Sequence, residues 1–510
     1  MNLLAKLPAC RIVLRHHALG GCASFVAVVL LALNARAEPK WIIHEWGTFT
    51  SLQNEAGEAI GGLNTDDEPV PEFVHRLANY LLLLPTEVPT IFFQGAPSCH
   101  PDVTMRLETP VIYFHPPAAG NKIGNVSVHV KFRGGWLTEF YPDAHPDATG
   151  FKDYEPGKRG TARLFQFGPL HASTESTLAW EYLKIGGDWP LTNTTAHVWT
   201  SPRAVQAALV QTASGESEKF LFYRGVAHLN APLKISRDTN TGELLLRSQL
   251  EELPTDKPLA IRSIWLVDIQ PGGNIAFRPL PSLTLDRNPK KILAHTPAVF
   301  SPGDFSSGNL EKLKAALQTA LVADGLFADE AQALLNTWEW SYFKSPGLRV
   351  FFLVPRAWTD FYLPLEMSLS ADINRVMVGR IELVTPEQRN ALQKIARFPP
   401  VQIASEIGQL YTNFYGKVTF DSVFGGTRKP SQREVQQLNK DFAHVNAGQI
   451  TLASFVSVPA GYQTYLDLGR FRNALVLDEV KRRPALTNFI SAYRLEGYQS
   501  ESGFDSSILK

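Results

Sequence analysis

The sequence predicts an α+β protein of several domains, with an antiparallel β-sandwich-rich N-terminal half and an α+β or mainly helical C-terminal half. Three observations predict this class. An export-signal pattern occupies the first 37 residues, short runs of strand-forming residues follow as far as about residue 300, and leucines at helical spacing begin at Leu310. A β-rich body is therefore expected to precede a part in which helices and strands are mixed.

Residues 1–37 have the three parts of a secretory signal peptide. Lys6, Arg11 and Arg15 form a basic start, Ala18–Leu33 is uncharged, and Ala-Arg-Ala at 35–37 is a small-x-small cleavage site. The uncharged stretch of 16 residues is shorter than the roughly 20 that span a bilayer as a helix. We expect a cleaved signal and a periplasmic or extracellular protein; the alternative is a chain tethered by an uncleaved N-terminal anchor.

The composition of the mature chain limits its partners. The signal takes four of the 49 Lys+Arg and none of the 49 Asp+Glu, which leaves a net charge of about −4. Nucleic-acid binding needs concentrated positive charge, so a nucleic-acid partner is excluded. No later apolar run reaches membrane length, and we expect no stable transmembrane helix after signal cleavage. Cys99 is the one cysteine after residue 37 and is free, paired between chains, or a ligand.

The N-terminal half is expected to contain two segments. Residues 38–108 carry a strand pattern and a helix from Pro71 to Leu84, and are expected to pack on the β-rich region at 109–300. In that region Asn125–Phe132 alternates apolar and polar residues, the pattern of a strand with one buried face. Strands are predicted at Val111–His115, Asn125–Phe132, Ala162–Phe167, Thr177–Ile185, Phe220–Tyr223, Glu243–Arg247 and Ala260–Ile269.

The C-terminal half, 301–510, is predicted to be α+β or mainly helical. Eight prolines between residues 254 and 302 favour an extended connection before it. Leucines from Leu310 to Leu321 predict a helix that ends near Gly325, and Thr385 begins another as an N-cap with a capping box. Further elements are predicted as helices at 331–342, 401–414, 432–442 and 485–493, and as strands at 349–354 and 375–383, with a bulge at Gly379.

Histidine is concentrated in one part of the chain. Nine of the eleven histidines after residue 37 lie between His44 and His228, where an even spread would place about four. Imidazole, thiolate and carboxylate groups are ligands that suit zinc or copper. The spacing of these residues along the chain matches no known metal-binding motif, so the sequence makes no cofactor certain. The candidate ligands are His44, His75, Cys99, His100, His115, Asp143 and His145.

Each of these candidates has a structural alternative. His44 and Glu45 point to opposite faces of a regular strand unless Gly47 or a bulge breaks the pleat, and no second His follows at helical spacing. Cys99 and His100 share a loop that a partly buried thiol explains better than a ligand does, because cysteine is often a small apolar residue. Asp143 and His145 alternate in a segment whose composition is also that of a solvated turn.

Common catalytic motifs are missing from the sequence. It contains no Gly-x-Ser-x-Gly, Walker or dinucleotide-binding glycine motif. Forked guanidinium groups near strand ends are candidates for holding a carboxylate or phosphate, and pairing with nearby acids is the structural alternative. These anion-binding candidates are Arg349, Arg356, Arg375 and Arg380.

Four segments resemble a group of large exported bacterial proteins that has no established activity. They are His44–Thr50 (HEWGTFT), Glu108–Phe114 (ETPVIYF), Phe220–Gly225 (FLFYRG) and Arg375–Arg380 (RVMVGR). The matching segments extend over most of the chain after the signal. The resemblance implies export and a bacterial source, and it assigns a role to no residue.

Two functions follow as hypotheses. The first is an exported, non-catalytic envelope or extracellular protein that binds a small molecule, polymer or protein partner through its β-rich half. The alternative is a metal-dependent, zinc-type hydrolase with a site drawn from residues 44–145 and with Glu45 or Glu108 as general base. The sequence favours the first, because no set of candidate ligands has the spacing of a known metal motif.

Overall fold

The computed structural model describes residues 40–64, 69–81, 92–93, 96–97, 99–118, 120–150, 169–250, 257–397 and 460–487. The predicted signal, the predicted strand at 162–167 and the predicted helices at 401–414 and 432–442 lie outside these residues, as does most of 485–493. The described strands and helices from Trp41 onward belong to one compact unit.

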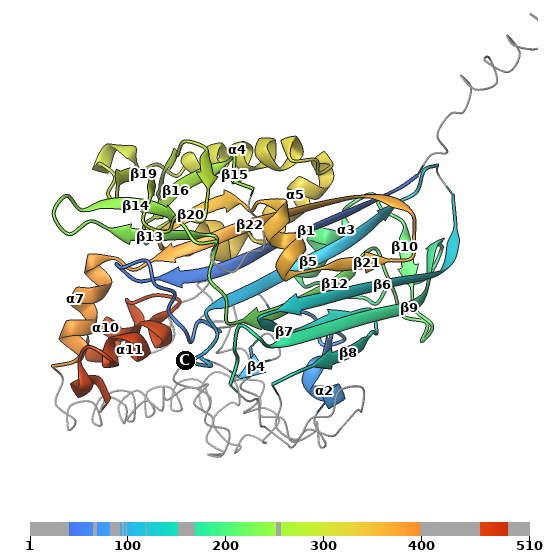
Figure 1. Cartoon of the computed structure of the whole chain (residues 1–510), viewed down its shortest axis with the longest axis horizontal. Helices are drawn as coiled ribbons and strands as arrows, with labels where there is room; N and C mark the ends of the chain where they lie inside the picture. Colours follow the sequence, from blue (N-terminus) through green and yellow to red (C-terminus); the bar gives the residue numbers. More distant parts are fainter. Residues whose placement is uncertain are drawn as a thin grey trace, which may run out of the picture. The chain divides into compact units, whose positions relative to one another are not determined.

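A nine-stranded sheet forms the centre of this unit (Figure 1). Its long middle strand, β1, pairs in parallel with β22 and antiparallel with β5. Strands from before and after residue 300 therefore share one sheet. In spatial order the strands are β17 (Ile275–Pro279), β16 (Ile264–Ile269), β20 (Gly347–Leu353), β22 (Ala371–Leu383), β1 (Trp41–Gln53), β5 (Met105–His115), β12 (Leu221–Ala227), β7 (Gly135–Tyr141) and β2 (His75–Arg76).

The other sheets lie mostly in the N-terminal half, which confirms the β-rich prediction. The largest has six strands, with β6 and β9 as its long central pair. It comprises β11 (Ser217–Glu218), β10 (Leu209–Gln211), β9 (Glu175–Gly187), β6 (Ile123–Arg133), β21 (Leu365–Met367) and β8 (His145–Ala148). The small sheets are β13 (Leu233–Arg237) with β14 (Glu243–Ser248) and β19 (Ile292–Pro297), β15 (Leu259–Ile261) with β18 (Leu283–Leu285), and β3 (Phe92–Phe93) with β4 (Ala96–Pro97).

Most described helices lie in the C-terminal half, as predicted. The leucine pattern forms α4 (Asn309–Ala323), and α5 (Ala328–Thr337) with the π-helix η3 (Glu339–Lys344) follows it. Thr385 caps α7 (Pro386–Ile395) through the predicted capping box. The remaining helices are α2 (Leu77–Leu81), α3 (His197–Arg203), η2 (Pro302–Asp304), α6 (Arg356–Tyr362), α10 (Ala460–Leu466), α11 (Arg472–Val480) and η7 (Pro484–Leu486). In the described part of the chain, no helix has both the length and the apolar character needed to cross a membrane.

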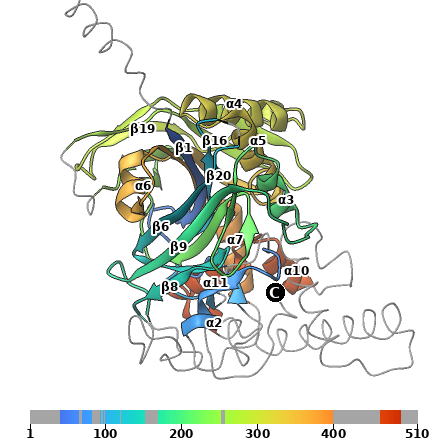
Figure 2. The ribbon, with the colours of Figure 1, turned by 90° about the vertical axis from the view of Figure 1, so that its right-hand side faces the viewer.

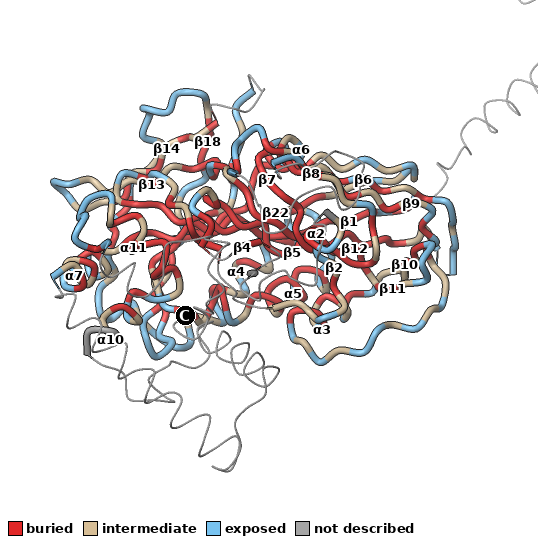
Figure 3. The backbone as a smooth tube through the Cα atoms, turned by 90° about the horizontal axis from the view of Figure 1, so that it is seen from below, coloured by how far each residue is buried: buried red, intermediate tan, exposed pale blue. Residues whose placement is uncertain are grey.

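Both faces of the nine-stranded sheet are largely buried, and apolar side chains pack on each of them. On one face, Trp46, Tyr113 and Phe351 pack with side chains of α4 and α5, including Leu317 and Leu334. The opposite face packs on the six-stranded sheet and its connections. Figure 2 shows these layers, and Figure 3 shows the buried strands running through the middle of the molecule. We call the first face the helix-covered face.

A bulge in β5 decides which polar side chains reach the helix-covered face. Trp46 pairs with Val111, but Thr48 pairs with Glu108, so β5 has one extra residue between these two pairs. Thr109 has a positive φ of 47° there, a conformation typical of a bulge. In a regular strand without the bulge, Glu108 and His115 would point to opposite faces. With it, both lie on the helix-covered face.

Three local predictions differ from the structure. The helix expected from Pro71 to Leu84 is described only as α2, because His75 and Arg76 extend to pair with β7 as strand β2. The proline-rich stretch at 254–302 contains β15 to β19 and is not an extended connection. Gly379 makes no bulge; a Cβ atom at this position would lie 2.4 Å from the Phe352 ring, so glycine leaves room for that ring.

Candidate metal centre

Two of the predicted ligands, His44 and His115, lie side by side at one end of the helix-covered face. In the β1–β5 register, His44 is opposite Tyr113 and His115 is opposite Ile42. The two histidines are therefore diagonal neighbours on adjacent strands, within reach of each other. Their ring centroids are 5.2 Å apart.

Glu330 of α5 completes a three-residue group with these histidines. Its Oε2 lies 2.6 Å from Nδ1 of His44, and its Oε1 lies 2.9 Å from Nε2 of His115. Glu330 is fully buried, and His44 and His115 are 4% and 8% exposed. Their ligand atoms all lie within 4.8 Å of one another, and they form the one such group among the described residues.

The position of Glu330 follows from the start of α5. Its carboxylate accepts the backbone N–H of Phe327, the N-cap residue, at 2.7 Å, as the third-position glutamate of a capping box does, although Phe327 has no side-chain acceptor to complete the motif. This contact fixes the rotamer of Glu330 and directs its carboxylate across to the strand ends. The helix start therefore places an acidic ligand opposite two imidazole rings.

A backbone carbonyl orients His115 from the other side. Nδ1 of His115 donates to the carbonyl oxygen of Gln206 at 3.1 Å, because a carbonyl only accepts. The N–H of Gln206 in turn donates to Asp329 at 2.9 Å. Metal-binding histidines usually have such a partner, which fixes the tautomer and leaves the second nitrogen for the ion.

The carboxylate of Glu330 is held in its ionised form. Burial would raise its pKa, but hydrogen bonds from His115 and His44 and the N–H of Phe327 outweigh burial and lower the pKa below the ordinary value. An ionised carboxylate with two imidazole nitrogens is a donor set that suits zinc, copper and iron.

The distances also fit an ion. Ligands about 2.0–2.1 Å from a tetrahedral zinc ion are about 3.3 Å from one another. The two contacts between Glu330 and the histidines, 2.6 and 2.9 Å, need to lengthen by less than 1 Å to reach this value. These contacts use different carboxylate oxygens, and the three ligand atoms lie within 4.8 Å of one another, so binding one ion also requires the widest separation to shorten.

The remaining metal candidates lie elsewhere. His75 and Asp143 both contact Glu216: Nε2 of His75 is 2.9 Å from its carboxylate, and the backbone N–H of Asp143 donates to it at 2.7 Å. The Asp143 carboxylate itself accepts the hydroxyl of Tyr80 at 2.5 Å. This cluster is a half-exposed hydrogen-bonded network, separate from the group at His44.

The neighbours Cys99 and His100 point to different partners. The Cys99 thiol is buried and accepts a hydrogen bond from the side chain of Asn473 at 3.3 Å. His100 is buried against Trp136, and its Nδ1 accepts the backbone N–H of Asp102 at 3.2 Å. His145 is exposed on β8. None of these three joins the group formed by His44, His115 and Glu330.

The two candidate general bases are engaged in other contacts. Glu45 lies on the face opposite His44, as the strand period predicts, and its carboxylate accepts from Tyr223 and Arg375. Burial, together with the charge of Glu45, raises the pKa of Tyr223 well above its ordinary value. Tyr223 therefore acts as a neutral donor, and Glu45 neutralises Arg375 inside the core.

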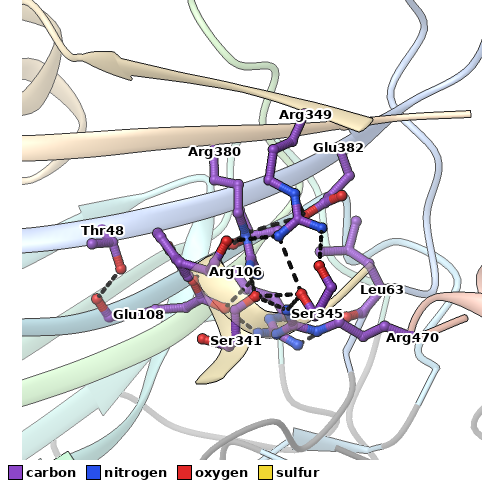
Figure 4. Close-up of polar contacts among 12 residues, drawn as sticks. Thr48, Leu63, Arg106, Glu108, Ser341, Ser345, Arg349, Arg380, Glu382 and Arg470 are labelled. Carbon is purple, nitrogen blue, oxygen red and sulfur yellow. Dashed lines mark hydrogen bonds and ion pairs between the residues drawn. The ribbon is translucent and has the colours of Figure 1, made fainter. Parts of the chain in front are cut away.

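Glu108 belongs to a buried arginine cluster at the other end of the helix-covered face (Figure 4). It accepts from Arg106, from the hydroxyl of Thr50 at 2.7 Å and from the hydroxyl of Tyr342 at 2.5 Å, and Arg380 lies 3.6 Å away. The cluster holds Arg106, Arg349, Arg380 and Arg470 with Glu108 and Glu382.

Arginines of this cluster cap the π-helix η3. Arg380 and Arg470 each donate to the carbonyl oxygen of Ser341 at 2.7 Å, and Arg349 donates to those of Tyr342 and Ser345. Burial lowers the pKa of Arg349 to about 10; Glu382 opposes the shift, and the nearby Arg380 and Arg470 add to it. The cluster therefore joins η3 to strands β5, β20 and β22.

The anion-binding candidates accordingly separate into two places, one in the buried arginine cluster and one around Asp360. Arg349 and Arg380 lie in the buried cluster, and Arg375 is held by Glu45 and Asp360. Arg356 is exposed and pairs with Asp360 at 3.2 Å. All four guanidinium groups lie beside acids, as in the structural alternative, and they do not converge on one site.

One surface cavity lies on the outer side of the six-stranded sheet. Its volume is about 320 Å³, and residues of β6, β9 and β21 line it together with Pro364. Lys131 is paired with Glu175 at 3.1 Å, and His129 with Glu181 at 2.5 Å. The lining residues are His129, Val130, Lys131, Arg133, Thr177, Leu178, Ala179, Pro364 and Glu366.

Comparison with known proteins adds one finding: no protein-family model matches the sequence. The four segments singled out by resemblance nevertheless lie together in the fold. They form adjacent strands β22, β1, β5 and β12 at the centre of the nine-stranded sheet. Both the candidate metal centre and the arginine cluster are built on these strands.

Proposed function

We propose that this chain is an exported metalloprotein that holds one divalent transition-metal ion, zinc or copper, between His44, His115 and Glu330. The observation that carries the proposal is the convergence of three buried ligand atoms within 4.8 Å. Export is supported by the signal pattern of residues 1–37. The expected binding of a partner by the β-rich half stays part of the proposal, and the cavity on the six-stranded sheet is a place for it.

Hydrogen bonding at His115 fits a bound ion as well as a doubly protonated ring. Both nitrogens of this ring face acceptors, the Gln206 carbonyl and the Glu330 carboxylate. A neutral imidazole has a single N–H, so either a second proton or a metal ion satisfies the contact with Glu330. A metal ion bridges the carboxylate and both histidines at once, which a proton on one ring does not.

The metal content of purified mature protein tests the proposal. After zinc loading and removal of free metal, we expect about one zinc ion per chain in the wild type and less than about 0.2 in His115→Ala and Glu330→Ala. Each variant loses one of the three ligands, and this weakens zinc binding strongly. His295→Ala is the matched control, since His295 is exposed on β19 and outside the group. Equal zinc in the His115 variant and the wild type would reject the site.

A second candidate function is metal-dependent hydrolysis, the alternative predicted from sequence. Three protein ligands leave a fourth position for water, as in catalytic zinc sites. Among the described residues, however, the hydrogen bonds of the two imidazoles go to Glu330 and Gln206 alone, so no separate general base is in contact. Zinc-dependent turnover of activated ester or phosphodiester substrates, lost in His115→Ala and kept in His295→Ala, would favour this function over simple binding.

A further inference from the structure

The candidate metal centre meets solvent through apolar side chains. The ring of Phe327 lies over both imidazoles, with centroid distances of 4.5 Å to His44 and 4.7 Å to His115. Phe327 is 41% exposed although His44, His115 and Glu330 are buried, and Ile42, which pairs with His115, is 36% exposed. These two residues form an apolar rim beside the ligand atoms.

The rim residues follow from the placement of the ligands. Ile42 lies two residues before His44 on the same strand face, and Phe327 is the N-cap of the helix that supplies Glu330. Both are among the few large apolar side chains that the described chain leaves exposed. An exposed apolar group next to polar ligand atoms marks a contact surface for a molecule that has both an apolar part and a polar part.

The charge of the centre limits the ligand further. A divalent ion and the Glu330 carboxylate leave one positive charge, which a single anionic donor neutralises. The carboxylate of Asp329 borders the centre, where it accepts the N–H groups of Gln206 and Glu330. A ligand with several negative charges would face repulsion from it.

We infer that the open coordination position binds a small organic molecule with one anionic donor group and an apolar, ring-sized body that packs on Phe327 and Ile42. This inference rests on the proposed metal site and deepens it by naming the ligand class. The donor group binds the ion in the fourth position, and the apolar body covers the exposed ring. Carboxylates and hydroxamates that carry an aromatic ring belong to this class.

The test uses the mature protein loaded with cobalt(II), whose visible spectrum reports ligand exchange at the ion. Three probes are titrated: benzohydroxamate, acetohydroxamate and inorganic phosphate. We expect benzohydroxamate to bind about tenfold more tightly than acetohydroxamate, because burying its ring removes apolar surface from water. Phosphate is expected to bind more weakly than either hydroxamate.

Two variants connect the preference to the rim. Phe327→Ala is expected to keep the cobalt content and to reduce the ratio of the two hydroxamate affinities to less than about twofold, and Ile42→Ser to reduce it by a smaller amount. The control is Trp340→Ala, an exposed aromatic residue on η3, which should leave the ratio unchanged. Phe327→Leu keeps an apolar rim and guards against a simple loss of folding.

The outcomes are distinguishable. Failure to bind both zinc and cobalt would reject the proposed metal site and the inference with it. Stoichiometric cobalt with equal affinity for both hydroxamates, or with phosphate binding most tightly, would reject the ligand class and leave the metal site standing. An unchanged preference in Phe327→Ala would reject the apolar rim.

Discussion

Replacing Glu108 with glutamine tests whether charge holds the buried arginine cluster together. The change keeps the size of the side chain and one acceptor oxygen, so hydrogen bonds from Thr50 and Tyr342 can partly persist. It removes a negative charge that lies against Arg106 and 3.6 Å from Arg380, in residues that are fully buried. The substitution therefore isolates the electrostatic contribution.

The expected magnitude comes from the burial of this group. Removing one partner of a buried ion pair costs about 3–5 kcal/mol, because the remaining charge stays out of water without its counter-charge. Two guanidinium groups would share Glu382, which lies 3.2 Å from Arg349 and 3.6 Å from Arg380. We expect the free energy of unfolding to fall by about 3–5 kcal/mol for Glu108→Gln.

Urea unfolding followed by tryptophan fluorescence measures this loss. Glu366→Gln is the control, since Glu366 is exposed on β21 and should change stability by less than about 0.5 kcal/mol. Adding Arg380→Gln to Glu108→Gln should cost less than the sum of the two single losses, because the double variant removes an unpaired cation. A loss below about 1 kcal/mol for Glu108→Gln, or strict additivity, would refute the electrostatic account.

Three further results are expected. Burial would lower the pKa of His75, but the hydrogen bond and charge of Glu216 raise it. The stabilisation that this ion pair gives the folded protein is complete below the unfolded-state pKa of about 6.5 and is lost as pH rises through the folded-state pKa. His75→Gln should therefore cost more stability at pH 5.5 than at pH 8.5. Gly379→Ala should lower the free energy of unfolding by about 1–3 kcal/mol, since the new Cβ would collide with Phe352 and Phe49, and a loss under about 0.5 kcal/mol would contradict this packing. Zinc at 100 times its dissociation constant should stabilise the wild type by about 2.7 kcal/mol, reversibly with EDTA, and a similar gain in Glu330→Ala would contradict the site.

Local sequence patterns predicted individual elements well. The leucines from Leu310 to Leu321 and the capping box at Thr385 depend on neighbouring residues, and both helices form where predicted. The assembly of the central sheet depends on contacts between distant residues. β1 and β22 pair although His44 and its partner Asn374 are 330 residues apart in the chain, and no local pattern contains that information.

The candidate site also depends on contacts between distant residues, and the sequence therefore predicted only part of it. His44 and His115 could be singled out because histidine is uncommon and each occurs in a strand pattern. Glu330 was missed because a glutamate in the first turn of a helix is ordinary, and its contact with His44 joins residues 286 apart. The one feature of the sequence that singled out Glu330 was its position in the first turn of a helix. A glutamate is common at that position in helices that bind no metal.

X-ray absorption at the zinc K-edge of protein loaded with one equivalent tests the central claim most directly. The account predicts a four-coordinate ion with nitrogen and oxygen neighbours at about 2.0–2.1 Å, including the outer-shell scattering of two imidazole rings, and loss of one ring in His115→Ala. A sulfur neighbour at about 2.3 Å, which would point to Cys99, or a spectrum without imidazole scattering would contradict it.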